Sequence, residues 1–394
     1  MLSKIEWIAE RDKAWNEYAE RERKNPARLD EIQNKRMDFG EVTMRYGISV
    51  IGEPDEKGYP LYIAMHGGGG SPTPDINNQQ WEHMGIYYKN SVKRGVYVNT
   101  RGVRDTWDCH GNPESFPLYD RLIENMILFY NVDPNRVYFL GFSAGGDGVY
   151  ICAPRMADRL AAANMSAGHH NGTSVWNMRN TPLQLQVGEL DGAYGRNLVT
   201  VDYQVKLDEY ARKYGGYVHN TFVHFGKPHN FYDNHGDELQ EVIKDVYKWH
   251  DEAETSDEKP ATVKADTDAV HFLDRYKRNP YPERIVWDLK NRAPMRRVES
   301  FYWLSCPKDV QEGFIVADID KKKNKITILP DTTAKEFDIL LNDDLLDLDD
   351  IVRIETPNGG FEGKIERKKE EILKTLNERG DKDYIFSARY HVNI

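Results

Sequence analysis

A serine flanked by glycines is the feature that most constrains how this 394-residue chain folds. Residues 141–145 read Gly-Phe-Ser-Ala-Gly, which fits the pattern G-x-S-x-G. An apolar run at residues 137–140 precedes the pattern, and a stretch compatible with a helix follows it. A strand, a tight turn and a helix in this order hold the serine hydroxyl exposed, and glycine is needed at so sharp a bend. The pattern favours a nucleophilic Ser143 over an ordinary Gly/Ser turn before a helix.

A second glycine-rich segment lies upstream, at residues 66–70, and reads His-Gly-Gly-Gly-Gly. It follows the apolar run 61–65, which predicts a buried strand. Such a loop lets a substrate approach backbone N–H groups that stabilise negative charge on a carbonyl oxygen. A phosphate-binding loop is disfavoured because no Gly-Lys-Ser/Thr ends the segment. We predict that the N–H groups of Gly68 and Ala144 form an oxyanion hole, and that His66 is structural.

An acid and a base for the serine follow in the order that this arrangement requires. Residues 183–187 and 221–225 read as strands, and Asp191 and His229 lie just past their ends. Ligands of parallel sheets bind at the carboxyl ends of the strands, so the loops meet there. We predict that His229 accepts the Ser143 proton as the serine attacks a carbonyl, while Asp191 holds the imidazole. An acyl-enzyme then forms, and water releases it.

Other residues compete for these roles. Glu189 is an alternative acid, since such triads accept either carboxylate. His224 falls within a predicted strand and His235 lies past the loop, so each is a weaker base candidate. Asp147 follows the serine in the predicted helix, where a carboxylate in the first turn suits the helix dipole, and we interpret it as structural.

Side chains on the neighbouring loops are candidates for substrate contact. They are Arg101, Arg104, Trp107, His169, Trp176 and Tyr194. An arginine can bind a substrate carboxylate bidentately, or pair with Asp105 or Asp108 to brace its loop, and both readings stay open. His169 and His170 invite a metal interpretation, but no nearby cysteine or His-x-x-x-His spacing supports it. We expect neither a metal nor a cofactor.

The composition of the chain limits which classes of binding partner are expected. The net charge of −11, from 53 basic and 64 acidic residues, argues against nucleic acid or an anionic membrane as the main partner. Three scattered cysteines form neither a disulfide framework nor a zinc cluster. The first residues lack an apolar signal core, and no run reaches the ~18 apolar residues of a membrane span. We therefore expect a cytoplasmic protein.

Three segments are predicted: a helical arm at 1–38, a catalytic domain at 39–275, and a small β-rich domain at 276–394. The arm has apolar residues spaced for one helical face and is expected to pack on the catalytic domain. An oligomer contact through the arm or the last segment stays open. In the catalytic domain, strands alternate with helical stretches, which predicts an α/β fold with a doubly wound, mainly parallel sheet.

The predicted elements follow from apolar patterning and turn residues. Catalytic-domain strands are expected at 43–51, 62–65, 96–99, 137–140, 161–165, 183–187 and 221–225, with a closing helix at 237–250. Strands of the last segment are expected at 284–287, 301–304, 314–316, 326–328, 337–341 and 351–354, with a hairpin turn at 357–360. A helix at 368–378 should stop at Gly380. Trp287, Tyr302 and Trp303 are interpreted as packing residues rather than a carbohydrate-binding surface.

The glycine loop, the GFSAGGDG segment, and the loops of Asp191 and His229 resemble the α/β-hydrolase superfamily over residues 40–250. Within it, the chain is similar to the polyhydroxybutyrate depolymerase-like and feruloyl-esterase-like branch of carboxylesterases. The resemblance implies Ser143 as nucleophile, Asp191 as acid and His229 as base. Secreted members of that branch are often disulfide-bonded. This chain has no cysteine pairs and no evident signal, which weakens the expectation of an extracellular polymer substrate.

The leading functional hypothesis is a serine hydrolase that cleaves a small or oligomeric carboxylic ester. A serine peptidase of the prolyl-oligopeptidase type is an alternative, because the same triad cleaves amides. Those enzymes carry a large N-terminal propeller, which about forty residues before the first strand cannot form. A non-catalytic binding protein on a hydrolase scaffold is the third hypothesis, and the presence of all three triad residues argues against it.

Overall fold

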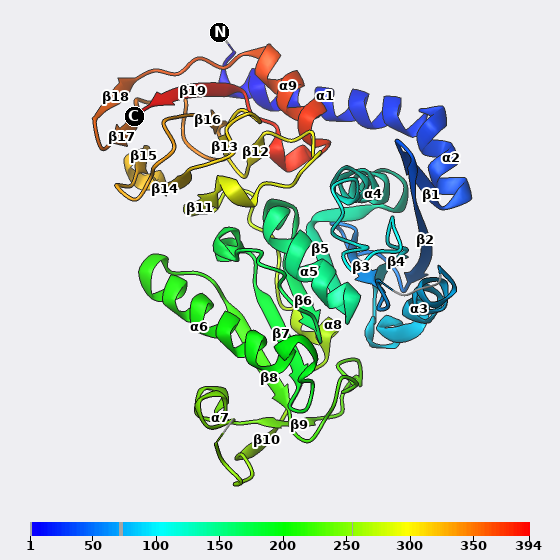
Figure 1. The fold of residues 1–394 in the computed structure, drawn as a ribbon. Coiled ribbons are helices and arrows are strands. Elements are labelled where there is room, and N and C mark those ends of the chain that lie inside the picture. The colour runs from blue at the N-terminus through cyan, green and yellow to red at the C-terminus, as the bar shows by residue number, and fades with distance from the viewer. Residues whose placement is uncertain (1, 71–73, 254) are drawn as a thin grey trace. The chain divides into compact units, whose positions relative to one another are not determined.

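A computed structural model describes residues 2–70, 74–253 and 255–394. It divides into two compact units. The large unit comprises Glu31–Arg278 and Ala293–Met295, and the small unit comprises Met1–Asp30, Asn279–Arg292 and Arg296–Ile394. Each unit has its own sheet system (Figure 1).

The large unit is built on one sheet that, in the described chain, has ten strands in the order β1-β2-β4-β3-β5-β6-β7-β8-β9-β10 (Figure 1). The strands are β1 (Arg36–Phe39), β2 (Val42–Ile51), β3 (Tyr59–Met65), β4 (Gly95–Thr100), β5 (Val132–Phe142), β6 (Ala162–Ser166), β7 (Leu183–Gly188), β8 (His219–His224), β9 (Gln240–Ile243) and β10 (Thr262–Ala265). From β4 through β8 the neighbours are parallel, and the outer strands are antiparallel. The predicted α/β fold with a mainly parallel sheet is confirmed.

Helices occupy the connections of this sheet. They are α3 (Pro74–Tyr87), α4 (Ser115–Tyr130), α5 (Ala144–Arg155), α6 (Arg196–Tyr214), α7 (Val246–Glu252) and α8 (Ala269–Leu273), with short 3-10 turns η1 (Lys89–Ser91), η2 (Ala157–Arg159), η3 (Trp176–Asn180) and η4 (Ala193–Gly195). Every residue of β4, β6 and β7 is buried, as expected for parallel strands covered on both faces. Tyr62, Tyr138 and Phe272 belong to one core cluster that joins the sheet to α8.

The predicted closing helix at 237–250 is wrong in its first half. Residues 240–243 form β9, which pairs antiparallel with both β8 and β10. Val242 and Ile243 are buried in that pairing, so sheet extension prevails over the helical spacing of the segment. Helix begins only after Asp245, whose side chain accepts a hydrogen bond from the Lys248 backbone N–H at 3.0 Å.

The small unit contains two sheets in its described residues, one five-stranded (β11-β14-β15-β17-β18) and one four-stranded (β12-β13-β16-β19). Its strands are β11 (Arg284–Asp288), β12 (Ser300–Phe301), β13 (Leu304–Ser305), β14 (Phe314–Asp320), β15 (Lys325–Ile328), β16 (Glu336–Leu341), β17 (Val352–Thr356), β18 (Gly359–Gly363) and β19 (Ala388–Asn393). The predicted β-rich character, the hairpin near residue 357 and the helix stop at Gly380, with φ 56°, are confirmed. The helices and 3-10 turns that complete the chain are α1 (Lys4–Arg23), α2 (Pro26–Asn34), α9 (Lys369–Arg379), η5 (Leu289–Asn291), η6 (Lys321–Lys323) and η7 (Lys382–Tyr384).

One predicted strand of the small unit, at 301–304, is broken in two. Tyr302 has φ 54°, and the backbone there reverses so that β12 pairs antiparallel with β13. Trp287 and Trp303 are buried, which agrees with their interpretation as packing residues.

The expectation that the N-terminal arm packs on the catalytic domain is wrong for α1. A capping box formed by Ser3 and Glu6 starts this helix. Its apolar face, with Trp7 and Tyr18, joins a core cluster with Ile372 of α9. The helical periodicity of the arm was read correctly, but spacing alone does not say which apolar surface the stripe meets.

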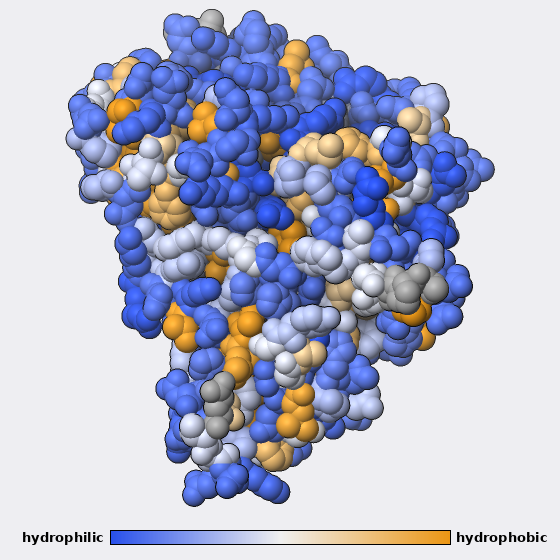
Figure 2. All heavy atoms as spheres, in the orientation of Figure 1, coloured by the Kyte–Doolittle hydropathy of each residue, from blue (hydrophilic) through white to orange (hydrophobic). Residues whose placement is uncertain are grey.

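The hydrophilic character of the surface agrees with the low mean hydropathy of the chain. On the face that Figure 2 shows, hydrophilic residues dominate and hydrophobic ones are scattered. Among the helices of the described residues, none combines the length and the apolar character needed to cross a bilayer.

Candidate active site

The turn between β5 and α5 holds Ser143 in a conformation that few residues adopt. Its backbone has φ 60° and ψ −120°, and its N–H donates to the Ser166 carbonyl at 2.9 Å. A Cβ on Gly141 would lie 2.2 Å from the Gly145 carbonyl oxygen. A Cβ on Gly145 would lie 2.0 Å from the Met65 carbonyl oxygen. The two glycines therefore allow the close backbone approach that exposes the serine.

The structure brings Ser143, Asp191 and His229 together. The Nδ1–H of His229 donates to Asp191 Oδ2 at 2.8 Å, and its Nε2 accepts from Ser143 Oγ at 2.9 Å. Asp191 and His229 follow β7 and β8, so all three side chains stand at the carboxyl ends of parallel strands. Asp191 is buried, and its other oxygen lies 3.5 Å from Nη1 of Arg196. One continuous hydrogen-bonded chain thus links a carboxylate, an imidazole and a hydroxyl.

The rival residues are engaged elsewhere. Glu189 accepts a hydrogen bond from the Gly226 backbone N–H at 2.7 Å. His224 is buried in β8 beside Gln186, at 2.9 Å, and burial lowers its pKa to about 3. His235 lies 2.5 Å from Glu238.

The glycine loop after β3 is fixed by an asparagine of α3. Asn77 Oδ1 accepts from the Gly69 N–H at 2.8 Å, and its Nδ2 donates to the Gly69 carbonyl at 2.9 Å. Gly68 has φ 102°, and a Cβ there would lie 2.4 Å from Asn77 Oδ1. Gly68 and Ala144 line the same pocket as Ser143. The N–H of Ala144 opens α5 and has no acceptor within its own helix.

His66, Cys109 and His110 form a buried group whose donor atoms all lie within 4.8 Å of one another, close enough to hold a metal ion. The ring nitrogens are, however, already engaged. His66 Nε2 accepts from the Gly102 N–H at 3.1 Å, so its Nδ1–H donates to the Gly67 carbonyl at 2.5 Å. His110 Nε2–H donates to the His66 carbonyl at 3.0 Å. Burial lowers the pKa of both rings, to about 4 for His66, which favours two neutral imidazoles that brace the loop.

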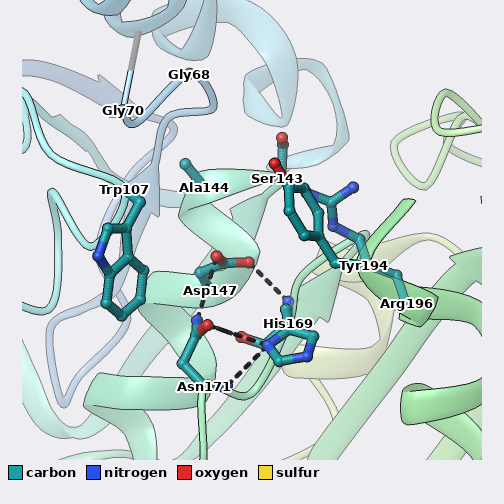
Figure 3. A pocket seen from close by; sticks show the side chains of 10 residues that line it. All are labelled: Gly68, Gly70, Trp107, Ser143, Ala144, Asp147, His169, Asn171, Tyr194 and Arg196. Carbon is teal, nitrogen blue, oxygen red and sulfur yellow. Dashed lines mark hydrogen bonds between the residues drawn. The ribbon is translucent and has the colours of Figure 1, made fainter.

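A pocket of about 720 Å³ opens beside the serine (Figure 3). It is lined by Gly68, Gly70, Trp107, Ser143, Ala144, Asp147, His169, Asn171, Tyr194 and Arg196. Three of the predicted contact residues, Trp107, His169 and Tyr194, are among them. Sequence reasoning interpreted Asp147 as structural and missed it as a lining residue. Its position four residues after Ser143, about one helical turn, is the signal that was available.

Arg101, Arg104 and Trp176 do not line this pocket. Arg101 is buried, forms an ion pair with Asp105 and donates to Asn78 at 3.1 Å. Arg104 forms an ion pair with Glu114 at 2.5 Å. The aromatic ring of Trp176 stacks on Tyr210 with centroids 3.5 Å apart. Local partners of opposite charge or apolar character therefore hold side chains that sequence proximity had assigned to the substrate.

The deciding observation is the combination of topology and site: an antiparallel β2 beside a parallel sheet, and a strained serine at the end of β5. The chain has the α/β-hydrolase fold. The order of serine, aspartate and histidine along the chain matches the order expected for this fold.

Comparison with known proteins leaves the activity open. A 105-residue segment, 26% of the chain, is 31% identical to the bifunctional acetylxylan esterase/xylanase XynS20E of Neocallimastix patriciarum, and it spans 15% of that protein's length. No protein-family model matches the chain.

Solved structures similar to this chain include esterases and a peptidase. A thermostable esterase is 19% identical with a TM-score of 0.40, covering 62% of each chain. Est1E from Butyrivibrio proteoclasticus is 12% identical with a TM-score of 0.32, over 49% of this chain and 89% of its own. An acylaminoacyl peptidase is 13% identical with a TM-score of 0.34, over 50% of this chain and 37% of its own. These values establish neither an activity nor a substrate.

Proposed function

We propose that the protein is a serine hydrolase that cleaves carboxylic esters through an acyl-enzyme on Ser143. The observation that carries the proposal is the hydrogen-bonded chain from Asp191 through His229 to the Ser143 hydroxyl, at 2.8 Å and 2.9 Å. This series of hydrogen bonds ends at a pocket large enough for a small-molecule ester. The name of the curated relative includes an acetylxylan esterase, which agrees with ester cleavage.

The chemistry follows from the donors and acceptors in place. His229 Nε2 takes the Ser143 proton as Oγ attacks the ester carbonyl, and Asp191 stabilises the imidazolium. The N–H groups of Gly68 and Ala144 stabilise the oxyanion. Collapse of the tetrahedral intermediate expels the alcohol, which receives the proton from His229. Water, deprotonated by the same nitrogen, then attacks the acyl-enzyme and frees the acid and Ser143.

The test is a panel of p-nitrophenyl esters and aminoacyl anilides, run on the intact protein, Ser143→Ala and Ser49→Ala. Ser49 is a half-buried serine of β2 and serves as the matched control. We expect ester turnover in the intact protein and in Ser49→Ala, and a loss of at least roughly 10³-fold in Ser143→Ala. Turnover of anilides alone would favour the peptidase alternative and overturn ester cleavage.

Covalent labelling by a fluorophosphonate tests the nucleophile separately. We expect labelling of the intact protein and of Ser49→Ala, and none of Ser143→Ala. An intact protein that neither reacts with the probe nor cleaves any ester would instead favour a binding protein on a hydrolase scaffold.

A further inference from the structure

The pocket beside Ser143 has a polar floor that the proposed chemistry does not use. We call Asp147, His169 and Asn171 the carboxylate floor. Asp147 Oδ1 accepts from the His169 backbone N–H at 2.7 Å, and its Oδ2 accepts from Asn171 Nδ2 at 3.3 Å (Figure 3). Asn171 Nδ2 also donates to the His169 carbonyl at 2.9 Å. These bonds fix the carboxyl group in one orientation at the pocket wall.

The Asp147 carboxylate has hydrogen-bond acceptor sites that these bonds leave unused. A carboxylate offers about four lone-pair sites, and the two hydrogen bonds come from neutral donors. Burial raises the pKa of Asp147, against the two hydrogen bonds and the positive charge of Arg196, which lower it. A half-buried carboxyl group that faces a cavity with unused acceptor sites favours ligands that bring their own hydrogen-bond donors.

Two aromatic side chains share the pocket with this floor. Trp107 and Tyr194 line the same pocket and are 54% and 80% exposed. In Figure 3 the two rings lie on either side of the segment that carries Ser143 and Ala144. Tyr194 is held at φ 58°, a backbone conformation uncommon for a bulky residue, with Arg196 over its ring at 5.0 Å. Two exposed aromatic side chains beside a polar floor suit a ring with an apolar face and hydroxyl groups at its edge.

We propose that Asp147 is a specificity-determining residue that accepts hydrogen bonds from hydroxyl groups of the ester substrate. This inference rests on the proposed ester hydrolysis. The hydroxyl groups can belong to the alcohol part, as in a monoacylated glycoside, or to the acyl part, as in a hydroxyacid ester. The recognition chemistry is the same in both, and matched substrates separate the two sources.

The experiment uses two pairs of esters that differ in their hydroxyl groups. The alcohol-side pair is a monoacetylated methyl pyranoside and cyclohexyl acetate. The acyl-side pair is ethyl 3-hydroxybutanoate and ethyl butanoate. In the wild-type protein, we expect kcat/KM for the hydroxylated member of one pair to exceed that of its partner by roughly 10-fold or more. The pair that shows the preference identifies the side of the ester that meets Asp147.

The variants are Asp147→Asn, Asp147→Ala and the control Asp75→Asn, whose carboxylate is exposed in α3. We expect Asp147→Ala to remove most of the preference, mainly through a higher KM for the hydroxylated ester. Asp147→Asn should lose part of the preference, because the amide still accepts one bond but carries no charge. Asp75→Asn should behave as the wild type.

Three results overturn the proposal. The first is an equal loss for both members of each pair, which would mean that Asp147 positions the helix and not the substrate. The second is a wild-type kcat/KM that is nearly the same for the two esters of each pair. This result can be obtained even if both Asp147 variants fail to fold. The third is a stronger preference for an ester that carries an ammonium group, which would assign the floor to a cation. If the wild type cleaves no ester at all, the proposed function itself fails, and that outcome is distinct from these three.

Discussion

Two buried carboxylates, one in each unit, are stabilised in different ways. In the small unit, Asp343 pairs with Arg367 at 2.6 Å, and both side chains are 3% exposed. In the large unit, Asp233 is fully buried, and its partners are hydroxyl groups. Those of Tyr87 and Tyr88 donate to it at 2.8 Å each, and that of Ser166 donates at a shorter distance. One carboxylate is neutralised by a fixed cation, and the other is held by neutral donors.

The kind of partner determines whether a buried carboxyl group keeps a fixed charge or can gain and lose a proton. A close ion pair with arginine keeps its charge over a wide pH range, so it fastens loops together. A carboxyl group held by neutral donors can change its protonation state, and burial raises the pKa of Asp233 to about 6. Asp233 lies four residues after His229, and the Ser166 carbonyl accepts from the Ser143 N–H. Ser166 therefore links the titratable Asp233 to the backbone of the proposed nucleophile.

The largest expected effect concerns the carboxylate bound to the imidazole. Asp191→Asn replaces the acceptor of the His229 Nδ1–H by an amide that favours the wrong tautomer, so kcat should fall by roughly 10⁴-fold. Steady-state kinetics on a p-nitrophenyl ester measure this change, with Glu189→Gln as the control on the same loop. A loss below about 10-fold in Asp191→Asn, or an equal loss in Glu189→Gln, would assign the acid role elsewhere.

Breaking the buried pair of the small unit should affect stability and leave catalysis unchanged. Arg367→Ala leaves the buried Asp343 charge without its cation, and we expect a loss of about 3–5 kcal/mol in the free energy of unfolding of this unit. Hydrogen exchange of the β14 amides reports it. Arg353→Ala, which removes an exposed pair with Glu362, should cost at most about 1 kcal/mol. A fall in kcat/KM of the folded Arg367→Ala protein would show that the two units are functionally coupled.

Asp233 offers a pH-dependent test of the same contrast. Its pKa is raised from 3.8 to about 6 in the folded state, so folding favours the protonated form. The contribution of this proton is fully present below about pH 4 and is lost as the pH rises through about 6. Asp233→Asn, which cannot titrate, should lack this dependence.

Urea unfolding at pH 4.5 and pH 7 measures the effect. We expect the stability of the wild type relative to Asp233→Asn to be greater at the lower pH, by about 1–3 kcal/mol. If the free energy of unfolding changed with pH in the same way for the wild type and Asp233→Asn, Asp233 would not be a titrating group of the folded protein.

The sequence predicted the parts of this site that local patterns determine. Apolar runs followed by glycine-rich or polar loops located Ser143, Asp191 and His229, because strands of a parallel sheet end at one edge. Long-range partner choice was out of reach. The helix α1 packs against α9 instead of the catalytic domain, and residues 240–243 join the edge of the sheet. Each outcome depends on a surface that no local spacing encodes.

The smallest expected effect concerns an ion pair that is exposed to solvent. Lys13 and Glu17 of α1 are 3.9 Å apart, and their side chains are 65% and 68% exposed. Glu17→Gln should lower the stability of the small unit by at most about 0.5 kcal/mol, because water screens the pair and ordering two long side chains opposes its formation. The difference should shrink further in 1 M salt. A loss as large as that of Arg367→Ala would mean that burial is not what separates the two pairs, and the contrast between fixed structural charge and titratable charge would then need another physical basis.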